Sequence, residues 1–227
     1  MPENVVKHFL DSAIHRPLDS PQSGKLTAWA LRRVGGSSHG KAVRVLSPVA
    51  VLGACVGFVL LFLYAGLFEY ALHRWMMHRR SRVLPYSYEM HTLLHHRVFG
   101  GDATYHVQRE EDRDLILFHW WQAPLLLAVH VPPVWGLQVA SGLPVLGGGM
   151  AALAVYYGLY EYLHWSMHNP AGRWVERIRV FRYLDARHHL HHGLWGINFN
   201  VVLPVGDLVF GTLRPARFAG SAISVRD

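Results

Sequence analysis

The chain of 227 residues alternates between long apolar segments and shorter polar ones. The longest apolar run extends from Pro48 to Leu72 and carries a single charge, Glu69, close to its end. About 20 apolar residues are enough for a helix to cross the hydrocarbon core of a bilayer. The pattern therefore predicts a membrane-spanning helix over residues 48–72.

Two further apolar segments predict a helical hairpin. Residues 115–134 form one candidate span, which is interrupted by His119, Pro124 and His130. Residues 143–163 form another, with Tyr and Trp side chains toward the end, as is typical of a membrane interface. Because only a short turn joins these two segments, we expect them to return the chain to the side of the membrane from which it entered.

The remaining segments complete the predicted organisation. Residues 197–212 are apolar but short and contain Pro204, so we expect a re-entrant or surface-lying segment. Residues 1–47 are basic and broken by Pro and Gly, which predicts a loosely structured N-terminal tail. A membrane domain then covers residues 48–213, and residues 214–227 form a C-terminal tail.

The composition agrees with a membrane protein. Apolar residues make up 51% of the chain and charged residues only 16%, which is fewer charges than soluble domains usually carry. The single cysteine, Cys55, excludes a disulfide framework and a cysteine-based zinc motif. The predicted fold class is all-α: an integral membrane helical bundle with a histidine-rich helical cap.

The net charge of +7 does not predict a nucleic-acid partner. The basic residues flank the apolar segments, and no nucleic-acid-binding motif accompanies them, so anionic lipid head groups explain them better. The predicted hairpin places residues 73–114 and 164–227 on one side, and these regions hold most of the 22 Lys and Arg residues. The positive-inside tendency therefore predicts that this side faces the cytoplasm. The side of the basic N-terminal tail stays open, because one crossing would place it outside.

Histidine is the most unusual feature of the sequence, with 17 residues. Two predicted spans end in similar motifs, EYALHRWMMH and EYLHWSMH, and denser motifs, HTLLHH and HHLHH, follow them. Neutral imidazole is the commonest metal ligand in proteins. The ten histidines that we predict as metal ligands are His73, His78, His91, His95, His96, His164, His168, His188, His191 and His192.

The spacing of these histidines indicates shared helical faces. Residues three or four apart lie on the same side of a helix. Sets with this spacing are His91 and His95, His164 and His168, and His188 with His191 and His192. His73 and His78 are five apart, which suits a frayed helix end.

The number of histidines predicts two metal ions. A zinc site uses only three or four protein ligands, whereas ten histidines give each of two ions four or five nitrogens and one open position. Nitrogen shells with open positions suit iron(II) and chemistry with O2. Nitrogen-rich sites also take up zinc, so zinc in an isolated preparation is compatible with this prediction.

Four acidic residues are candidates for orienting the imidazole rings. Metal-bound histidine usually donates its other ring N–H to a carboxylate or a carbonyl. Glu69 and Glu161 each lie one helical turn before the first histidine of a motif. Asp185 and Asp207 are further candidates on the same predicted side.

Several other histidines have simpler interpretations. His189 is a bystander or exchanges roles with His188, and His106 is a loop residue. His119 and His130 share one face of the predicted second span, where interhelical hydrogen bonds are the expected role.

The four histidine motifs, in this order around a membrane hairpin, resemble the fatty acid hydroxylase superfamily. That group includes fatty acid 2-hydroxylases, sterol desaturases and C4-methyl oxidases, and carotenoid hydroxylases. The resemblance covers residues 48–213 and includes Asn198-Phe199 and the closing segment DLVFGT. It implies a membrane enzyme whose two iron ions use O2 and two electrons to hydroxylate an unactivated C–H bond of a lipid.

The same resemblance leaves a desaturase or a carotenoid-ring hydroxylase open. The second motif is HxxxHH instead of the HxxHH of fatty acid 2-hydroxylases, and Asn200 replaces a glycine. No haem-binding HPGG motif precedes the core, so we expect a separate electron donor of the ferredoxin or cytochrome b5 kind. The sequence does not identify the lipid, which could be a fatty acyl, sphingolipid or sterol-like molecule.

Two non-enzyme classes compete with this interpretation. A membrane transport protein for metals would place its ligands near the bilayer midplane, whereas nearly all ten histidines follow the predicted span ends. A structural zinc protein would need neither iron nor turnover. These alternatives differ in measurable ways, through metal content and lipid products.

Overall fold

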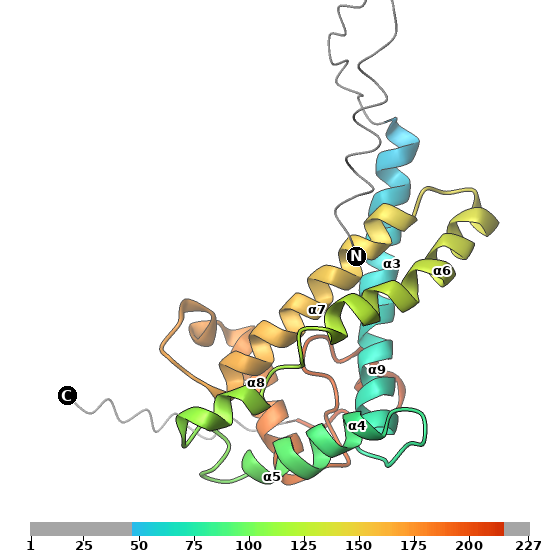
Figure 1. Ribbon diagram of the computed structural model, residues 1–227. Helices are drawn as coiled ribbons and strands as arrows, with labels where there is room; N and C mark the ends of the chain where they lie inside the picture. Colours follow the sequence, from blue (N-terminus) through green and yellow to red (C-terminus); the bar gives the residue numbers. More distant parts are fainter. Residues whose placement is uncertain (1–46, 216–227) are drawn as a thin grey trace, which may run out of the picture. The chain divides into compact units, whose positions relative to one another are not determined.

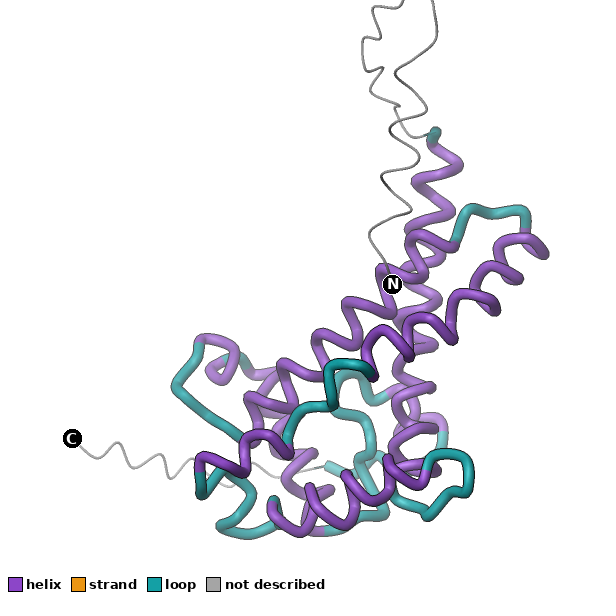
Figure 2. The backbone as a smooth tube through the Cα atoms, in the orientation of Figure 1, coloured by secondary structure: helices purple, strands orange, loops and turns teal. Residues whose placement is uncertain are grey.

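The computed structural model of the protein describes residues 47–215, so the two predicted tails lie almost entirely outside the described residues. Within this range every regular element is helical, which confirms the predicted all-α class. Figure 2 shows the helices and the loops that connect them.

Three long helices form the upper part of the described body (Figure 1). They are α3 (Pro48–Ala71), α6 (Gln122–Ser141) and α7 (Leu146–His168). The Ser47 hydroxyl accepts a hydrogen bond from the Ala50 N–H (3.2 Å) and caps the start of α3. Gly142 ends α6 with a φ of 66°, a left-handed conformation that glycine adopts without steric cost. The predicted hairpin between the second and third apolar segments is therefore present as α6 and α7.

Close packing of α3 against α7 depends on small residues at their crossing. A Cβ atom at Gly148 would lie 1.8 Å from the carbonyl oxygen of Ala54, so no larger residue fits at this position. The core between α3, α6 and α7 consists of buried apolar side chains from all three helices. These are Leu61, Ala65, Val134, Ala152, Leu153 and Tyr156.

Two of the described helices are long and apolar enough to cross a membrane, Pro48–Met77 and Gln122–Ser141. The first matches the predicted span. The second begins seven residues later than predicted, at Gln122, so that Pro124 lies in the first turn, where its missing N–H removes no helical hydrogen bond. The third predicted span lies within α7, which is not among these two helices.

Shorter elements form the lower part of the described body. They are η1 (Leu72–Met77), α4 (Pro85–Tyr88), η2 (Glu89–His95), α5 (His96–Val98), η3 (Glu110–Leu115), η4 (Trp174–Arg177), α8 (Arg179–Gly193) and α9 (Val205–Val209). The apolar segment 197–212 forms an irregular loop and α9, which packs against α3, with Gly206 directly beneath the ring of Tyr70.

Candidate metal centre

All ten histidines predicted as ligands come together in two groups of five. One ring nitrogen from each member of a group lies within 4.8 Å of those of the other four. Group one contains His73, His78, His91, His96 and His191. Group two contains His95, His164, His168, His188 and His192. Both groups have a composition and spacing that could hold a metal ion.

Two π-helical turns create the five-residue spacing in group one. In η1 the N–H of His78 donates to the carbonyl of His73 (3.0 Å), and the N–H of His96 donates to the carbonyl of His91 at the end of η2. Each π-type bond thus joins two histidines of the same group. The predicted frayed end at His73 and His78 is therefore wrong: the helix continues with a wider turn. Such turns are rare and occur often at functional sites.

The wider turn also separates residues that were predicted to act together. His91 and His95 belong to different groups, because the π-helical turn aligns His91 with His96 instead. In α8, His188 and His192 belong to group two, whereas His191 faces group one. The rings of His96 and His192 stack with centroids 4.2 Å apart, so the two groups adjoin.

Backbone carbonyls fix the orientation of five of the rings. The Nδ1 atom of each ring lies within hydrogen-bonding distance of a carbonyl oxygen, which only an Nδ1–H can satisfy. The pairs are His73 with Phe199, His95 with Leu115, His168 with Tyr105, His191 with Ile197, and His192 with Phe99. When Nδ1 carries the proton, Nε2 keeps its lone pair for a metal ion.

The Nε2 atoms point at one another at distances that suit metal coordination. His73 and His91 are 2.8 Å apart at Nε2, His78 and His191 are 3.0 Å apart, and His188 and His192 are 3.0 Å apart. In each pair one ring has its Nδ1 at a carbonyl oxygen (His73, His191 or His192), so its Nε2 lone pair faces the other ring. Two ligands at right angles on an ion with bonds of about 2.1 Å would be separated by roughly 3.0 Å. The observed spacing therefore fits ions bound between the rings.

Burial keeps these imidazoles neutral. The pKa of His95 is lowered to about 4 and that of His191 to about 3, mainly because burial disfavours the charged ring. Burial also lowers the pKa of His188 and His192 well below the usual value, and neighbouring histidines add to this effect. Neutral imidazole is the form that binds metals, so the centre is ready for metal at neutral pH.

The four acidic residues predicted to orient the rings do not contact them directly. Among the described residues, none of the four carboxylates hydrogen-bonds to a histidine ring. Glu69 accepts from the Asn200 side chain (3.0 Å), and Glu161 accepts from the Phe118 N–H (3.3 Å). The rings bind carbonyls instead, because the loops around the centre already present these oxygens at the required distance.

Asp185 and Asp207 form hydrogen bonds with the loops that supply these carbonyls. The Tyr105 hydroxyl donates to Asp185 (2.9 Å), and the Tyr105 carbonyl in turn accepts from His168. Burial raises the pKa of Asp185 to about 6. Asp207 accepts from the N–H groups of Phe199 (2.8 Å) and Asn200 (2.9 Å), in the loop whose carbonyls hold His73 and His191.

The other histidines between residues 47 and 215 lie outside both groups. His189 and His106 are exposed, and the His189 ring packs against Tyr105 at 4.4 Å between centroids. His130 is buried in α6 and lies 3.3 Å from the Tyr64 hydroxyl of α3, as expected for an interhelical hydrogen bond. His119 was predicted to lie in the second span, and this prediction is wrong. It precedes α6 and is exposed, because the helix starts only at Gln122.

An apolar cavity of about 70 Å³ leads from the long helices to group one. Its walls come from α3, α6 and α7, and His73 lies in its lining together with Leu72, Leu126, Leu153 and Tyr160. A second, more polar cavity of about 40 Å³ reaches both groups through His91 and His95.

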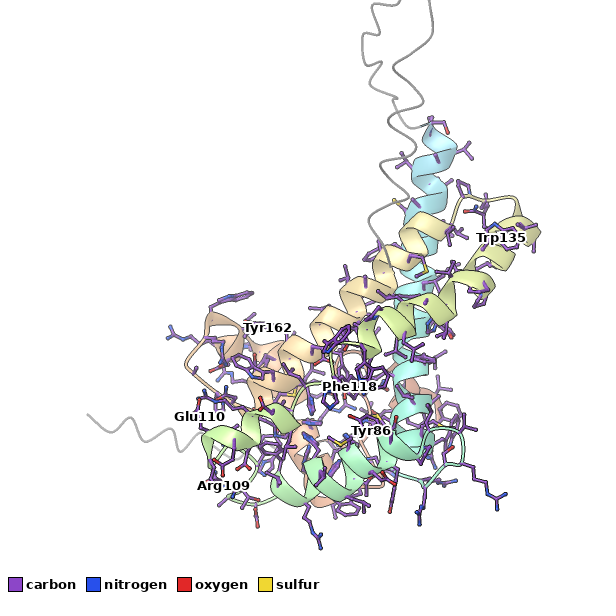
Figure 3. The ribbon with its side chains drawn as sticks, viewed as in Figure 1. Tyr86, Arg109, Glu110, Phe118, Trp135 and Tyr162 are labelled. Atoms are coloured by element: carbon purple, nitrogen blue, oxygen red, sulfur yellow. The ribbon has the colours of Figure 1, made fainter. Side chains whose placement is uncertain are left out.

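Phe118 lines both cavities and so separates them. Its ring stacks on Tyr160 with centroids 5.3 Å apart, and Glu161 holds its backbone. Figure 3 shows Phe118 close to Tyr86, which lines the second cavity.

Several important positions carried no signal in the sequence. The carbonyls that hold the rings belong to residues such as Phe99 and Ile197, whose side chains say nothing about this role. Arg187 directly precedes the HHLHH motif, and its full burial and its pairing with Asp207 are visible only in the structure.

Comparisons of the chain with protein-family models, with curated proteins and with solved structures find no match. The chemistry of the centre therefore rests on the residues described above.

Proposed function

We propose that the protein is a membrane-bound di-iron oxygenase that hydroxylates an unactivated C–H bond of a lipid. The observation that carries this proposal is the pairing of two adjoining groups of five histidines with an apolar cavity that reaches His73. The resemblance of the four histidine motifs to the fatty acid hydroxylase superfamily supports the same reaction.

The ligand set favours iron. Five nitrogens in each group exceed the four ligands of a structural zinc site, and neutral imidazoles with a free coordination position suit iron(II). With bound iron, the centre would supply the activation of O2. The balanced reaction takes lipid C–H, O2, two electrons and two protons to lipid C–OH and water.

The protein's own residues hold and shield the substrate. The cavity walls are mainly aliphatic and aromatic, so an apolar chain gains free energy by leaving water for them. The cavity opens among α3, α6 and α7, and two of these helices are apolar enough to cross a membrane, which favours entry from the bilayer. Its small volume favours a slender acyl chain over a fused ring system.

This function implies an arrangement in the membrane. We infer a helical bundle formed by α3, α6 and α7, with the histidine-bearing elements η1, η2 and α8 as a cap on the cytoplasmic side. The exposed arginines near the cap, such as Arg79 and Arg80, agree with the positive-inside tendency. The partners are the bilayer, a lipid substrate and a separate electron donor.

Lipid analysis of an expressing host tests the proposal. Lipid extracts from cells that produce the wild-type protein should contain a species heavier by one oxygen, which is absent with His168→Ala. Loss of two hydrogens would instead identify a desaturase, and an oxygenated carotenoid would identify a ring hydroxylase. Unchanged lipids in a host that offers all these substrates, together with iron-free protein, would contradict the proposal.

A further inference from the structure

The metal centre comes closest to solvent beside Trp195. Nine of the ten histidines are buried, and only His78 is partly exposed. The Trp195 ring lies 5.4 Å from the His96 ring and 6.2 Å from the His78 ring, between centroids. Its Nε1–H donates to the carbonyl of His192 (3.1 Å). One side chain therefore contacts residues of both histidine groups.

Trp195 also reaches the surface. Its side chain is 48% exposed, although the three ligand histidines of the preceding helix α8 are buried. Leu194 beside it is 57% exposed, and a Cβ atom at Gly196 would meet open space. This short stretch therefore presents two apolar side chains at the surface. Tryptophan and arginine side chains are enriched in the centres of protein interfaces.

Exposed arginines are next in sequence to the histidines at this contact. Arg79 and Arg80 directly follow His78, and Arg97 directly follows His96, the two histidines whose rings Trp195 touches. All three arginines are exposed, and none is among the arginines that form ion pairs in the described part of the chain. Unpaired positive charge next to the histidines that lie beside Trp195 favours an acidic protein partner.

The position of this surface suits electron entry. Trp195 contacts α5 through His96, and Figure 1 shows α5 at the opposite end of the described body from the turn between α6 and α7. The apolar cavity opens among the long helices, away from α5. Electron transfer slows steeply with distance. Its rate is therefore highest when the carrier docks where an aromatic ring lies between the surface and the ligands.

We propose that Trp195 with Arg79, Arg80 and Arg97 forms the docking surface for an acidic one-electron carrier protein, and that electrons enter the metal centre through the Trp195 ring. The carrier is oxidised by one electron in each of two encounters, and the metal centre gains the two electrons that one turnover consumes. This inference rests on the proposed function. Redox encounters of this kind bury little surface, so the complex is transient and sensitive to salt.

Binding to the metal-free full chain tests the surface without any enzymatic activity. The probe is an acidic plant-type [2Fe–2S] ferredoxin, titrated against the protein in lipid nanodiscs at low ionic strength. The variant Arg79→Glu/Arg80→Glu/Arg97→Glu should weaken binding by about tenfold or more. The matched control Arg177→Glu/Arg179→Glu/Arg182→Glu changes the same charge on other exposed arginines and should leave binding within about twofold. Equal losses in both variants, or no binding to the wild-type chain, would overturn the docking surface.

Reduction kinetics test the role of the Trp195 ring. In iron-loaded protein, Trp195→Leu should slow reduction by the reduced ferredoxin by about tenfold while ferredoxin binding persists, and Trp195→Phe should restore most of the rate. Trp174→Leu removes another exposed tryptophan, 72% exposed, and should change nothing. An unchanged rate in Trp195→Leu would exclude the ring as the entry route. If the chain binds no iron, the proposed function fails, whereas the binding comparison still decides the docking surface.

Discussion

Arg187 and Asp207 form a fully buried ion pair, with 2.8 Å between Nη2 and Oδ2, directly behind the metal centre. Asp207 also accepts a hydrogen bond from the Thr212 hydroxyl (2.7 Å). The pair joins α8, which supplies three ligand histidines, to the loop whose carbonyls hold His73 and His191. By joining these two elements, the ion pair helps to keep the histidine rings in their orientation.

Removing one member of this pair should strongly destabilise the protein. Asp207→Ala leaves the Arg187 charge buried without a partner, which costs about 3–5 kcal/mol. Denaturant unfolding of the metal-free protein in detergent measures this loss. Glu110→Ala, which breaks the solvent-exposed pair with Arg113, is the control and should cost about 1 kcal/mol or less. Similar losses in both variants would contradict the supporting role of Asp207.

Neighbouring histidines of α8 should differ sharply in their effect on metal content. His191→Ala removes a ligand atom from group one and should reduce the bound metal from close to two ions per chain toward one, measured by elemental analysis. His189→Ala changes an exposed side chain outside both groups and should keep the wild-type content. Equal metal loss in the two variants, or one ion per wild-type chain, would contradict the two-site assignment.

Metal-free protein should lose stability in mild acid. The pKa values of His95 and His191 in the folded state, about 4 and 3, lie below the unfolded value of 6.5. Between pH 6.5 and these values the unfolded chain binds more protons, so stability is complete above pH 6.5 and falls as the pH falls. Each group contributes up to about 1.4 kcal/mol per pH unit.

Unfolding midpoints of the metal-free protein at pH 7.5, 6 and 5 measure this dependence. Asp185 acts in the opposite direction, because its raised pKa of about 6 makes the folded state hold a proton in acid. The histidines are more numerous, so the net slope should follow them. A midpoint that is constant or rises toward pH 5 would show that the imidazoles are not buried as described.

Filling the apolar cavity should reduce lipid oxidation without affecting metal binding. Ala65 lines the cavity on α3, so Ala65→Leu occupies space that the substrate needs. Product formation should fall about tenfold or more, since a displaced reacting carbon lowers the rate strongly. Ala128→Leu adds the same bulk at an exposed position of α6 and should be neutral. Normal product with Ala65→Leu would place the substrate elsewhere.

The sequence predicted the elements of the centre better than their local geometry. The apolar run after Pro48 and the histidine motifs depend on composition and spacing, so the helix and the set of ten clustered residues could be predicted. The grouping could not, because it depends on π-helical turns at His73–His78 and His91–His96 that ordinary helical spacing does not anticipate. That these residues bind iron stays a prediction.

Contacts made by the backbone were also beyond prediction. The expected carboxylate partners, such as Glu69, instead fix loops, and carbonyls of distant residues hold the rings. Which carbonyl meets which ring depends on the path of the 197–201 loop, and this path follows from tertiary packing around Asp207. The start of α6 was misplaced for a related reason, since Pro124 was interpreted as an interruption when it marks the first turn.

The division of α8 between both histidine groups has a consequence for biogenesis. His78 and His191, whose Nε2 atoms are 3.0 Å apart, are separated by 113 positions in the chain, and group two likewise needs His188 and His192. Neither site is complete until the chain has been synthesised as far as His192. Ions bound before that moment would meet only partial ligand sets and be held weakly. Complete coordination of either ion therefore follows the synthesis of α8 and connects α8 to elements far earlier in the chain.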